Sequence, residues 1–444
     1  MFAGSKDGIY INLMMKHFLN QDTPGRLRVG VVNLSLVCLL LMSGLLIPTT
    51  QAHDSEIIPG EIVVRLRDGA NLAAIAAAHQ LDPQPLGQFG QRPIFRLRLL
   101  DNADPSQRAV EVQRNNEVLY AEPNYRSEAP EGRSRVSWAR GDQADYVAPW
   151  FVDVLGLTAA QQRSRGAGVT VAVLDTGVDM THPALVGHLV PGYDFVDNDA
   201  DPSEQGTAGP TSMYGHGTHV AGLIALVAPD AKIMPLRVLD VNGAGNVWVL
   251  AEALGFALDP DNNPATNDGV QVINLSLSTL RRTALLRDLL GACEDDVCPI
   301  NLPMVVAAAG NNGNDEPEYP AGENQHGLLA VGASTAADTV AAFSNRGSWV
   351  QLTAPGDQIT SSVPGGWGTW SGTSMAAPLV AGTAALVRSA APTFNAQQTA
   401  DHIEAHSRRS DSEVQQRLDI AAALNALPAA PPTNYRVWLP FVAR

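Results

Sequence analysis

Short runs of consecutive apolar residues recur between about residues 150 and 427. Typical strands are VTVAVLD (169–175), VQVINLSLS (270–278) and LLAVGAS (328–334), and typical helices are HVAGLIALV (219–227) and VWVLAEALGFAL (247–258). Strands that are apolar at every position are buried on both faces, as in parallel sheets. Because these strands alternate with helices, the region is expected to be α/β, with a mostly parallel sheet that helices cover on both sides.

A different pattern precedes this region. EIVVRL (61–66) and IFRLRLL (94–100) alternate between apolar and polar residues, NLAAIAAAHQ (71–80) and AVEVQRNN (109–116) are helical in period, and VLYAEPNY (118–125) follows them. The order strand, helix, strand, strand, helix, strand predicts a small α+β unit of the ferredoxin-like kind over residues 53–126. Residues 127–149 are charged, contain glycine and lack apolar periodicity, so an exposed linker is expected there.

The two ends of the chain differ from both regions. Residues 1–52 contain basic residues, then a charge-free stretch from Val29 to Ile47, then TTQA, which is typical of a cleaved export signal. A retained membrane anchor is the alternative, since the stretch is about long enough to span a thin bilayer. Residues 428–444 form a Pro-containing tail of no readable purpose.

Charge and cysteine content narrow the function classes. The formal net charge is -16, and the chain therefore lacks the basic footprint that nucleic-acid binding requires. In an exported protein, Cys293 and Cys298 of ACEDDVCP are best explained as one small disulfide loop. A metal site is the weaker explanation, because no second pair of cysteines accompanies them.

The segment WSGTSMAAPLVAG (370–382) places Thr373 and Ser374 before a run of small apolar residues. Such a run predicts a helix buried on all sides, and the hydroxyl residues are good helix N-caps. Alternatively, Ser374 is a nucleophile, because a helix N-terminus stabilises developing negative charge. A nucleophilic serine needs a histidine base and a group that orients the histidine.

Three polar residues follow predicted strands or open a predicted helix. Asp175 ends VTVAVLD, His216 lies between two glycines in GHGTHVAG, and Asn311 follows the strand MVVAAAG. The loops at the carboxyl ends of parallel strands carry functional groups, so these side chains are candidates for one cleft. Ordinary turn residues are the alternative for Asp175 and Asn311. A zinc site of His216 and His219 is disfavoured by their spacing, and His219 is expected to pack inside the domain.

The motifs VAVLDTGVD, HGTHVAG, AAAGNNG and SGTSMAAPLVAG, in this order, resemble those of the subtilisin-like serine proteases. The resemblance covers residues 150–427 and implies the subtilisin-like three-layer fold. Residues 53–126 resemble the inhibitory prosegment of the family. The resemblance implies a secreted or cell-surface endopeptidase made as a self-processing zymogen. It makes Ser374 the nucleophile, His216 the base, Asp175 the residue that orients His216, and Asn311 the oxyanion donor.

The resemblance also assigns substrate-binding residues. Two backbone segments would hold an extended peptide between them, and a third would form one wall of the first specificity pocket: Gly243, Ala244 and Gly245; Ser276, Leu277 and Ser278; Ala308, Ala309 and Gly310. The family usually has glycine where Ser278 stands. Glu318, before Tyr319 and Pro320, would lie at the pocket floor and favour Lys or Arg before the scissile bond. Alternatively, the Glu318 side chain points to solvent, as most glutamates do.

The resemblance implies no cofactor for the chemistry. It does imply a structural calcium ion. The loop YDFVDNDADPSE resembles a calcium loop of some relatives, with Asp194, Asp197, Asp199 and Asp201 as the ligands. A solvated acidic turn is the alternative.

The expected partners are protein or peptide substrates and the chain's own prosegment. Neither nucleic acid nor a stable membrane partner is expected after signal cleavage. A catalytically inactive binding module and a metal-dependent hydrolase remain as competing functions at this point.

Overall fold

The computed structural model describes residues 56–134, 138–209, 212–263, 265–266, 268–291, 302–409 and 416–428. The expected export signal, the pair Cys293 and Cys298, and all but the first residue of the tail lie outside these ranges.

The N-terminal part of the described chain has the predicted β-α-β-β-α-β order. Its elements are β1 (Ile57–Leu66), α3 (Leu72–Ala78), β2 (Gly87–Gln88), β3 (Ile94–Arg98), α4 (Pro105–Gln113) and β4 (Val118–Glu128). The strands lie in the antiparallel order β2-β3-β1-β4. Val64, Leu97 and Val112 belong to its core. Asn71 and Asp104 cap the two helices through their side chains, which explains where each helix begins.

The second part is built on a nine-stranded sheet in the order β16-β17-β13-β12-β11-β10-β6-β8-β7. Neighbouring strands are parallel except for the pair β16 and β17. Its strands are β6 (Thr170–Asp175), β7 (Tyr193–Asp194), β8 (Lys232–Arg237), β10 (Val272–Leu275), β11 (Met304–Ala308), β12 (Leu328–Ser334), β13 (Leu352–Pro355), β16 (Arg408–Arg409) and β17 (Gln416–Arg417).

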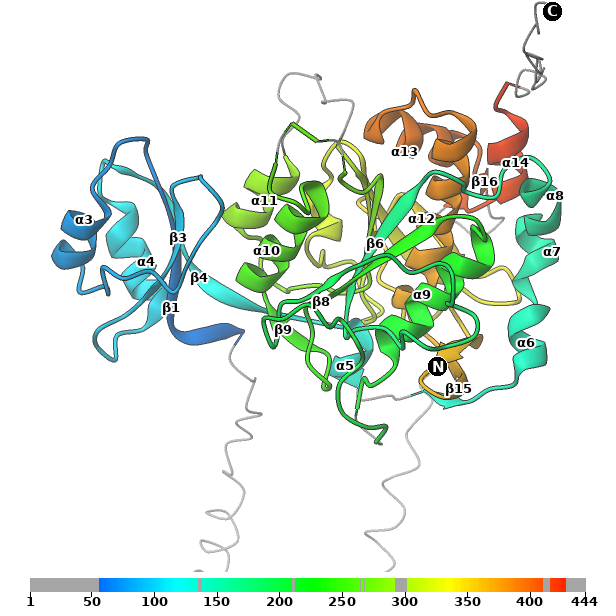
Figure 1. The fold of residues 1–444 in the computed structure, drawn as a ribbon, viewed down its shortest axis with the longest axis horizontal. Coiled ribbons are helices and arrows are strands. Elements are labelled where there is room, and N and C mark those ends of the chain that lie inside the picture. Colours follow the sequence, from blue (N-terminus) through cyan, green and yellow to red (C-terminus); the bar gives the residue numbers. More distant parts are fainter. Residues whose placement is uncertain are drawn as a thin grey trace, which may run out of the picture. The chain divides into compact units, whose positions relative to one another are not determined.

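Helices cover this sheet on both faces, as expected (Figure 1). Val171 and Val173 of β6 lie in one core with α9 (His216–Val227) and α12 (Thr373–Ala390). Ala172 and Leu174 lie in a second core with α10 (Val247–Leu258) and α11 (Ala284–Leu290). Successive residues of a strand point to opposite faces, so a strand between two cores must be apolar throughout. The predicted three-layer α/β fold is confirmed.

Smaller elements complete the described part of the chain. A three-stranded sheet has the order β14-β15-β5, and β14 packs on α9. The remaining elements are β5 (Ala139–Arg140), α6 (Gln143–Val147), α7 (Phe151–Leu155), α8 (Leu157–Gln161), β14 (Ile359–Val363), β15 (Gly366–Trp370), α13 (Ala396–Ala405), α14 (Ile420–Asn425) and the 3₁₀ turn η2 (Ala321–Glu323). None of the helices within the described ranges has the length and apolar character needed to cross a membrane.

The expectation of an exposed linker after residue 126 is wrong for its first residues. Strand β4 continues to Glu128 and pairs with β9 (Ala244–Asn246), and α5 (Pro130–Ser134) follows. Ser127, Ala129 and Glu131 are at most 1 % exposed. The polar composition suggested solvent exposure, but these polar groups are satisfied by partners elsewhere in the fold rather than by water.

Candidate active site

Asp175 and His216 come together from two elements of the large domain. Asp175 is the last residue of β6, and His216 is the first residue of α9. Both residues are 0 % exposed, and His216 Nδ1 lies 2.7 Å from Asp175 Oδ1. The same oxygen accepts the backbone N–H of Thr176 at 2.8 Å. The carboxylate therefore holds one nitrogen of the imidazole and leaves Nε2 for other partners.

Gly217 permits this close packing. A Cβ atom at Gly217 would lie 2.1 Å from the carbonyl oxygen of Gly177 and 3.0 Å from Cβ of Asp175. Glu204 adds a further link between the two elements. Its Oε1 accepts hydrogen bonds from Thr176 Oγ1 and from the N–H and hydroxyl of Thr218, at 3.0–3.1 Å. The strand that ends at Asp175 and the helix that begins at His216 are thus fixed to one carboxylate.

Ser374 is buried at the start of α12, where Gly372 and not a hydroxyl residue is the N-cap. The Ser374 hydroxyl donates to Oε2 of Glu131 at 2.6 Å, and His216 Nε2 lies 3.1 Å from the same oxygen. The interpretation of Ser374 as a helix cap is therefore wrong. One carboxylate oxygen of Glu131 bridges the serine and the histidine that the sequence singled out.

The other carboxylate oxygen of Glu131 is bound by Asn311. Asn311 Nδ2 donates to Glu131 Oε1 at 2.7 Å, while Asn311 Oδ1 accepts the N–H and the hydroxyl of Thr373, both at 2.9 Å. These two bonds fix the amide so that its N–H group faces the carboxylate. A Cβ atom at Gly372 would lie 1.7 Å from Glu131 Oε1, so a side chain there would fill the space that this oxygen occupies.

The close contact of His216 with two carboxylates shifts the pKa values of both His216 and Glu131. Burial alone would lower the pKa of His216, but the adjacent Asp175 and Glu131 carboxylates outweigh it and raise this pKa to about 10. Burial would raise the pKa of Glu131, but hydrogen bonding and charge from His216, with donors from Ser374 and Asn311, hold it below its ordinary value. The full chain therefore has an ion pair between His216 and Glu131.

The two predicted peptide-binding segments face each other across the chain's own residues 127–129. Ser127 and Glu128 pair antiparallel with Gly245 and Ala244 of β9. On the other side, Glu128 exchanges two backbone hydrogen bonds with Ser278, each of 2.9 Å. Ala129 N–H donates to the carbonyl of Gly243 at 2.9 Å. An extended peptide backbone therefore fits between Gly243–Gly245 and Ser276–Ser278.

The third predicted segment lies beside Glu318. The carbonyls of Ala309 and Gly310 accept from the Asn345 side chain and backbone N–H at 3.0 and 2.9 Å. A Cβ atom at Gly310 would lie 2.4 Å from Glu318 Oε1. Glu318 is 2 % exposed, and its carboxylate forms an ion pair with Arg133 at 2.6 Å. The alternative that Glu318 points to solvent is therefore wrong.

The calcium loop is arranged differently from the expectation. Arg237 of β8 forms ion pairs with Asp194 and Asp197, and Asp194 is 1 % exposed. Asp199 and Asp201 accept backbone N–H groups of Asp201 and Ser203 within the loop. Since a guanidinium neutralises the buried carboxylate, the loop does not depend on a cation for this purpose. The four aspartates do not form a compact ligand cluster among the described residues.

His219 and a surface group of aspartates are the two other candidates for binding a metal ion. His219 is buried, and its Nε2 lies 3.1 and 3.2 Å from the carbonyls of Ile359 and Gly368. Burial lowers the pKa of His219 to about 3, and His219 packs inside the domain as expected. In the described ranges, the one group of three or more potential ligands with mutually close ligand atoms is Asp259, Asp261 and Asp268, which lies at the surface.

Comparison with known proteins identifies the family. A model of the subtilase family matches residues 166–420, more than half of the chain. The chain belongs to the subtilase family. It is a serine protease of this family, and a model of the fervidolysin N-terminal prodomain matches residues 47–124. The ferredoxin-like unit of this subtilase is therefore its prodomain.

Individual relatives agree with this assignment. The subtilase is 35 % identical over 346 residues to a thermophilic serine proteinase of Bacillus sp. (strain AK1), covering 75 % of this chain and 78 % of the relative. It is 38 % identical over 238 residues to thermitase of Thermoactinomyces vulgaris, covering 51 % and 77 %. The crystal structure of fervidolysin from Fervidobacterium pennivorans superposes with a TM-score of 0.67 at 24 % identity, which supports the fold alone. That alignment covers 85 % of this chain and 62 % of fervidolysin, less than two thirds of its length.

Sequence reasoning missed several residues of this site. Glu131 and Arg133 lie in a segment that was interpreted as linker, and their polar, proline- and glycine-flanked context gives no signal of burial. Glu204 lies in an acidic loop, and Arg237 is the last residue of the mostly apolar strand β8. A cation within a buried strand was the one available signal, because it requires a carboxylate partner.

Proposed function

We propose that this subtilase is a secreted serine endopeptidase that acts through an acyl-enzyme. Ser374 would attack the peptide carbonyl, His216 would take its proton and return it to the leaving amine, and Asp175 would orient the imidazole. Asn311, together with the backbone N–H of Ser374, would donate to the tetrahedral oxyanion. The single observation that carries the proposal is the Glu131 carboxylate, which Ser374, His216 and Asn311 bind together.

The bound carboxylate supports these roles through its charge. One of its oxygens receives the amide N–H of Asn311, which is the kind of donor that an oxyanion needs. The other lies between the hydroxyl of Ser374 and Nε2 of His216, where a proton would move between nucleophile and base. A negatively charged group is therefore stable at the position where the reaction develops negative charge.

Substrates would be proteins or peptides in an extended conformation. The backbone pairing of residues 127–129 with Gly243–Gly245 and Ser278 is the geometry that a substrate strand would adopt. Backbone pairing of this kind accepts many sequences, so specificity would depend on side-chain pockets.

We further infer that the chain is a self-processing zymogen. Residues 127–131 fill both the peptide-binding strands and the catalytic centre, so a substrate can enter only after this segment has left. Export to the cell surface or the medium agrees with the N-terminal signal pattern. The chain would need no cofactor for the chemistry, and neither nucleic acid nor membrane would be a lasting partner.

An active-serine probe tests the proposal directly. The full-length chain, allowed to mature, should hydrolyse casein and become labelled by a fluorophosphonate at Ser374. Ser374→Ala or His216→Ala should each lower turnover by about a million-fold and Asp175→Ala by about thirty-thousand-fold, as in subtilisin. Ser371→Ala, three residues before the nucleophile, is the matched control and should stay labelled and active.

The competing functions give different results. An inactive binding module would fold, bind peptide and resist the probe. A metal-dependent hydrolase would lose activity with a chelator and remain unlabelled. Hydrolysis by a contaminant-free Ser374→Ala variant would end the proposal.

A further inference from the structure

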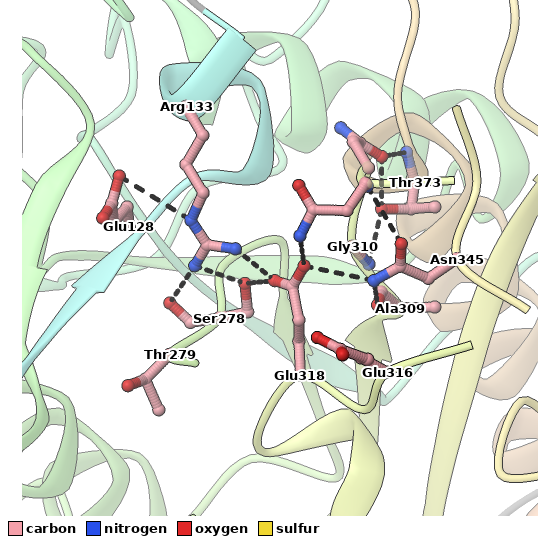
Figure 2. Close-up of polar contacts among 12 residues, drawn as sticks. Glu128, Arg133, Ser278, Thr279, Ala309, Gly310, Glu316, Glu318, Asn345 and Thr373 are labelled. Carbon is pink, nitrogen blue, oxygen red and sulfur yellow. Dashed lines mark hydrogen bonds and ion pairs between the residues drawn. The ribbon is translucent and has the colours of Figure 1, made fainter. Parts of the chain in front are cut away.

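Glu318 is a buried carboxylate whose hydrogen bonds are complete (Figure 2). Its Oε1 accepts from the side-chain amides of Asn312 and Asn345 at 2.8 and 3.1 Å. Its Oε2 accepts from the Ser278 hydroxyl and from Arg133 Nη1. Three of these four donors are neutral side chains of the catalytic domain, and the fourth is a cation from α5.

The cation belongs to the segment that must leave the cleft. Arg133 lies two residues after Glu131, which occupies the catalytic centre. Among the residues that the structure describes, Arg133 is the one side chain that forms an ion pair with Glu318. When residues 127–133 leave, Glu318 keeps its neutral donors but loses its counter-charge. A buried carboxylate without a cation is costly, so the vacated site favours a new positive group.

The site is adjacent to the nucleophile. The Glu318 carboxylate packs against Gly310, where no Cβ atom would fit. Gly310 N–H donates to Thr373 Oγ1 at 3.1 Å, and Thr373 directly precedes Ser374. On the opposite side, Ser278 borders the strand that binds the peptide backbone. A substrate side chain reaching this carboxylate therefore belongs to the residue next to the scissile bond.

We propose that Glu318 makes the enzyme select Arg or Lys at the residue immediately before the scissile bond. This inference rests on the proposed endopeptidase function and adds its substrate class. Arg133 is the internal model of such a side chain, since its Nη1 binds Glu318 and its Nη2 lies 3.3 and 3.5 Å from Ser278 Oγ and O. A planar guanidinium makes both contacts at once, whereas an ammonium is a single point donor, so Arg is preferred over Lys.

Matched peptide substrates test the charge of the side chain separately from its shape. The full-length chain is allowed to mature and is given Ala-Ala-Pro-X-p-nitroanilide with X as Arg, Lys, citrulline or Phe. Citrulline has nearly the shape of Arg without its charge. We expect kcat/KM for Arg to exceed that for citrulline by about 30-fold or more, because losing one partner of a buried charge pair costs at least this much.

Two glutamate variants assign this ratio to one residue. In Glu318→Gln, the ratio of kcat/KM for the Arg peptide to kcat/KM for the citrulline peptide should fall to near one. Glu316→Gln changes an exposed glutamate of the same loop, and should leave the ratio unchanged. Figure 2 shows Glu316 beside Glu318 with no interaction drawn to the residues around Arg133.

The outcomes separate this inference from the proposed function. Hydrolysis of the Phe peptide with a ratio of Arg to citrulline near one in the wild type overturns the inference and leaves the endopeptidase intact. A folded chain that hydrolyses none of the four peptides and resists the serine probe overturns the proposed function. If Glu318→Gln fails to mature, two measurements on the wild type decide: the ratio of Arg to citrulline, and inhibition of Phe hydrolysis by the cation benzamidine. A high ratio together with inhibition supports the inference. A ratio near one or a lack of inhibition overturns it.

Discussion

At the scale of single residues, the fold fixes the orientation of the Asn311 side-chain amide. Both acceptor bonds of its amide oxygen go to Thr373, so its N–H group has no freedom to turn away from the catalytic centre. A donor that is fixed before the reaction costs no reorganisation when charge develops. In the uncut chain that donor holds Glu131, which is why the same atoms serve inhibition first and catalysis later in the proposed function.

Replacing this donor should affect turnover and not substrate binding. Asn311→Leu should lower kcat of the matured enzyme by about 100- to 1000-fold with little change in KM, the loss found for the oxyanion donor of subtilisin. Initial rates over a range of peptide concentrations separate the two constants. An Asn311→Leu enzyme with normal kcat would show that the amide does not contact the oxyanion.

The ion pair of His216 with Glu131 predicts a pH dependence of the uncut chain. The pKa of His216, about 10 in the folded chain, lies above its ordinary value of about 6.5. The stabilisation is therefore fully present below about pH 6.5 and is lost as the pH rises through about 10. The lowered pKa of Glu131 keeps that carboxylate ionised at pH 6.

Thermal unfolding in a Ser374→Ala background, which prevents processing, measures this effect. Adding Glu131→Gln should lower Tm clearly at pH 6 and much less at pH 10.5. The introduced amide keeps the shape of the carboxylate and can donate to a neutral imidazole, so shape is not the variable. An equal loss of Tm at both pH values would argue against the ion pair.

At the scale of elements, Arg237 joins β8 to the loop that follows β7. Its guanidinium is 5 % exposed and pairs with Asp194, which is 1 % exposed, and with the more exposed Asp197. Removing one partner of a buried pair leaves an uncompensated charge, whereas exposed pairs contribute little. The connection between the edge strand β7 and its neighbour β8 thus depends on a charge pair.

Two arginine variants compare buried and exposed pairs. Arg237→Met should lower the free energy of unfolding by about 3–5 kcal/mol. Arg165→Met, which breaks the exposed pair with Asp230, should cost at most about 1 kcal/mol. Urea unfolding of both variants in the Ser374→Ala background measures the difference, and similar losses for the two would contradict the role assigned to Arg237.

At the scale of the whole molecule, the prodomain contacts the catalytic domain at three kinds of site. Strand β4 pairs with β9, and both carboxylate oxygens of Glu122 accept N–H groups at the start of α11, from Ala284 and Leu285. Arg65 of β1 forms an ion pair with Asp288 of α11. These contacts place the prodomain's last strand between β9 and Ser278, so in the proposed function docking of the prodomain would also block the peptide-binding site.

The position of the maturation cut follows from the two proposals together. Because residues up to Glu131 fill the cleft and Glu318 selects a cation, we expect cleavage after Arg133, giving a mature chain that begins at Ser134. Intact mass and N-terminal sequencing locate the cut. Arg133→Gln should slow it, whereas Arg140→Gln, at an exposed arginine, should not. A mature chain that begins before Glu131 would contradict the expectation.

The sequence by itself determined the layers of the fold, and it singled out Asp175, His216, Asn311 and Ser374, which the structure brings together. Strand β6 is apolar from Val171 to Leu174 because it lies between two cores, and this physical requirement is local enough to read from the sequence. The β-α-β-β-α-β order of the prodomain was predictable for the same reason, since period and capping residues are local signals. Asp175, His216 and Asn311 were found because each lies at the end of a strand or the start of a helix.

Only the tertiary structure decided which charges meet. Glu131 lies 243 positions from Ser374 along the chain, Arg133 lies 185 positions from Glu318, and Arg237 lies 43 positions from Asp194. No periodicity links such residues, because the contact of two distant charges depends on how whole elements pack. Residues 127–133 therefore have the composition of an exposed linker, although they are buried like a bound peptide. They are buried because the surface of the catalytic domain is complementary to them.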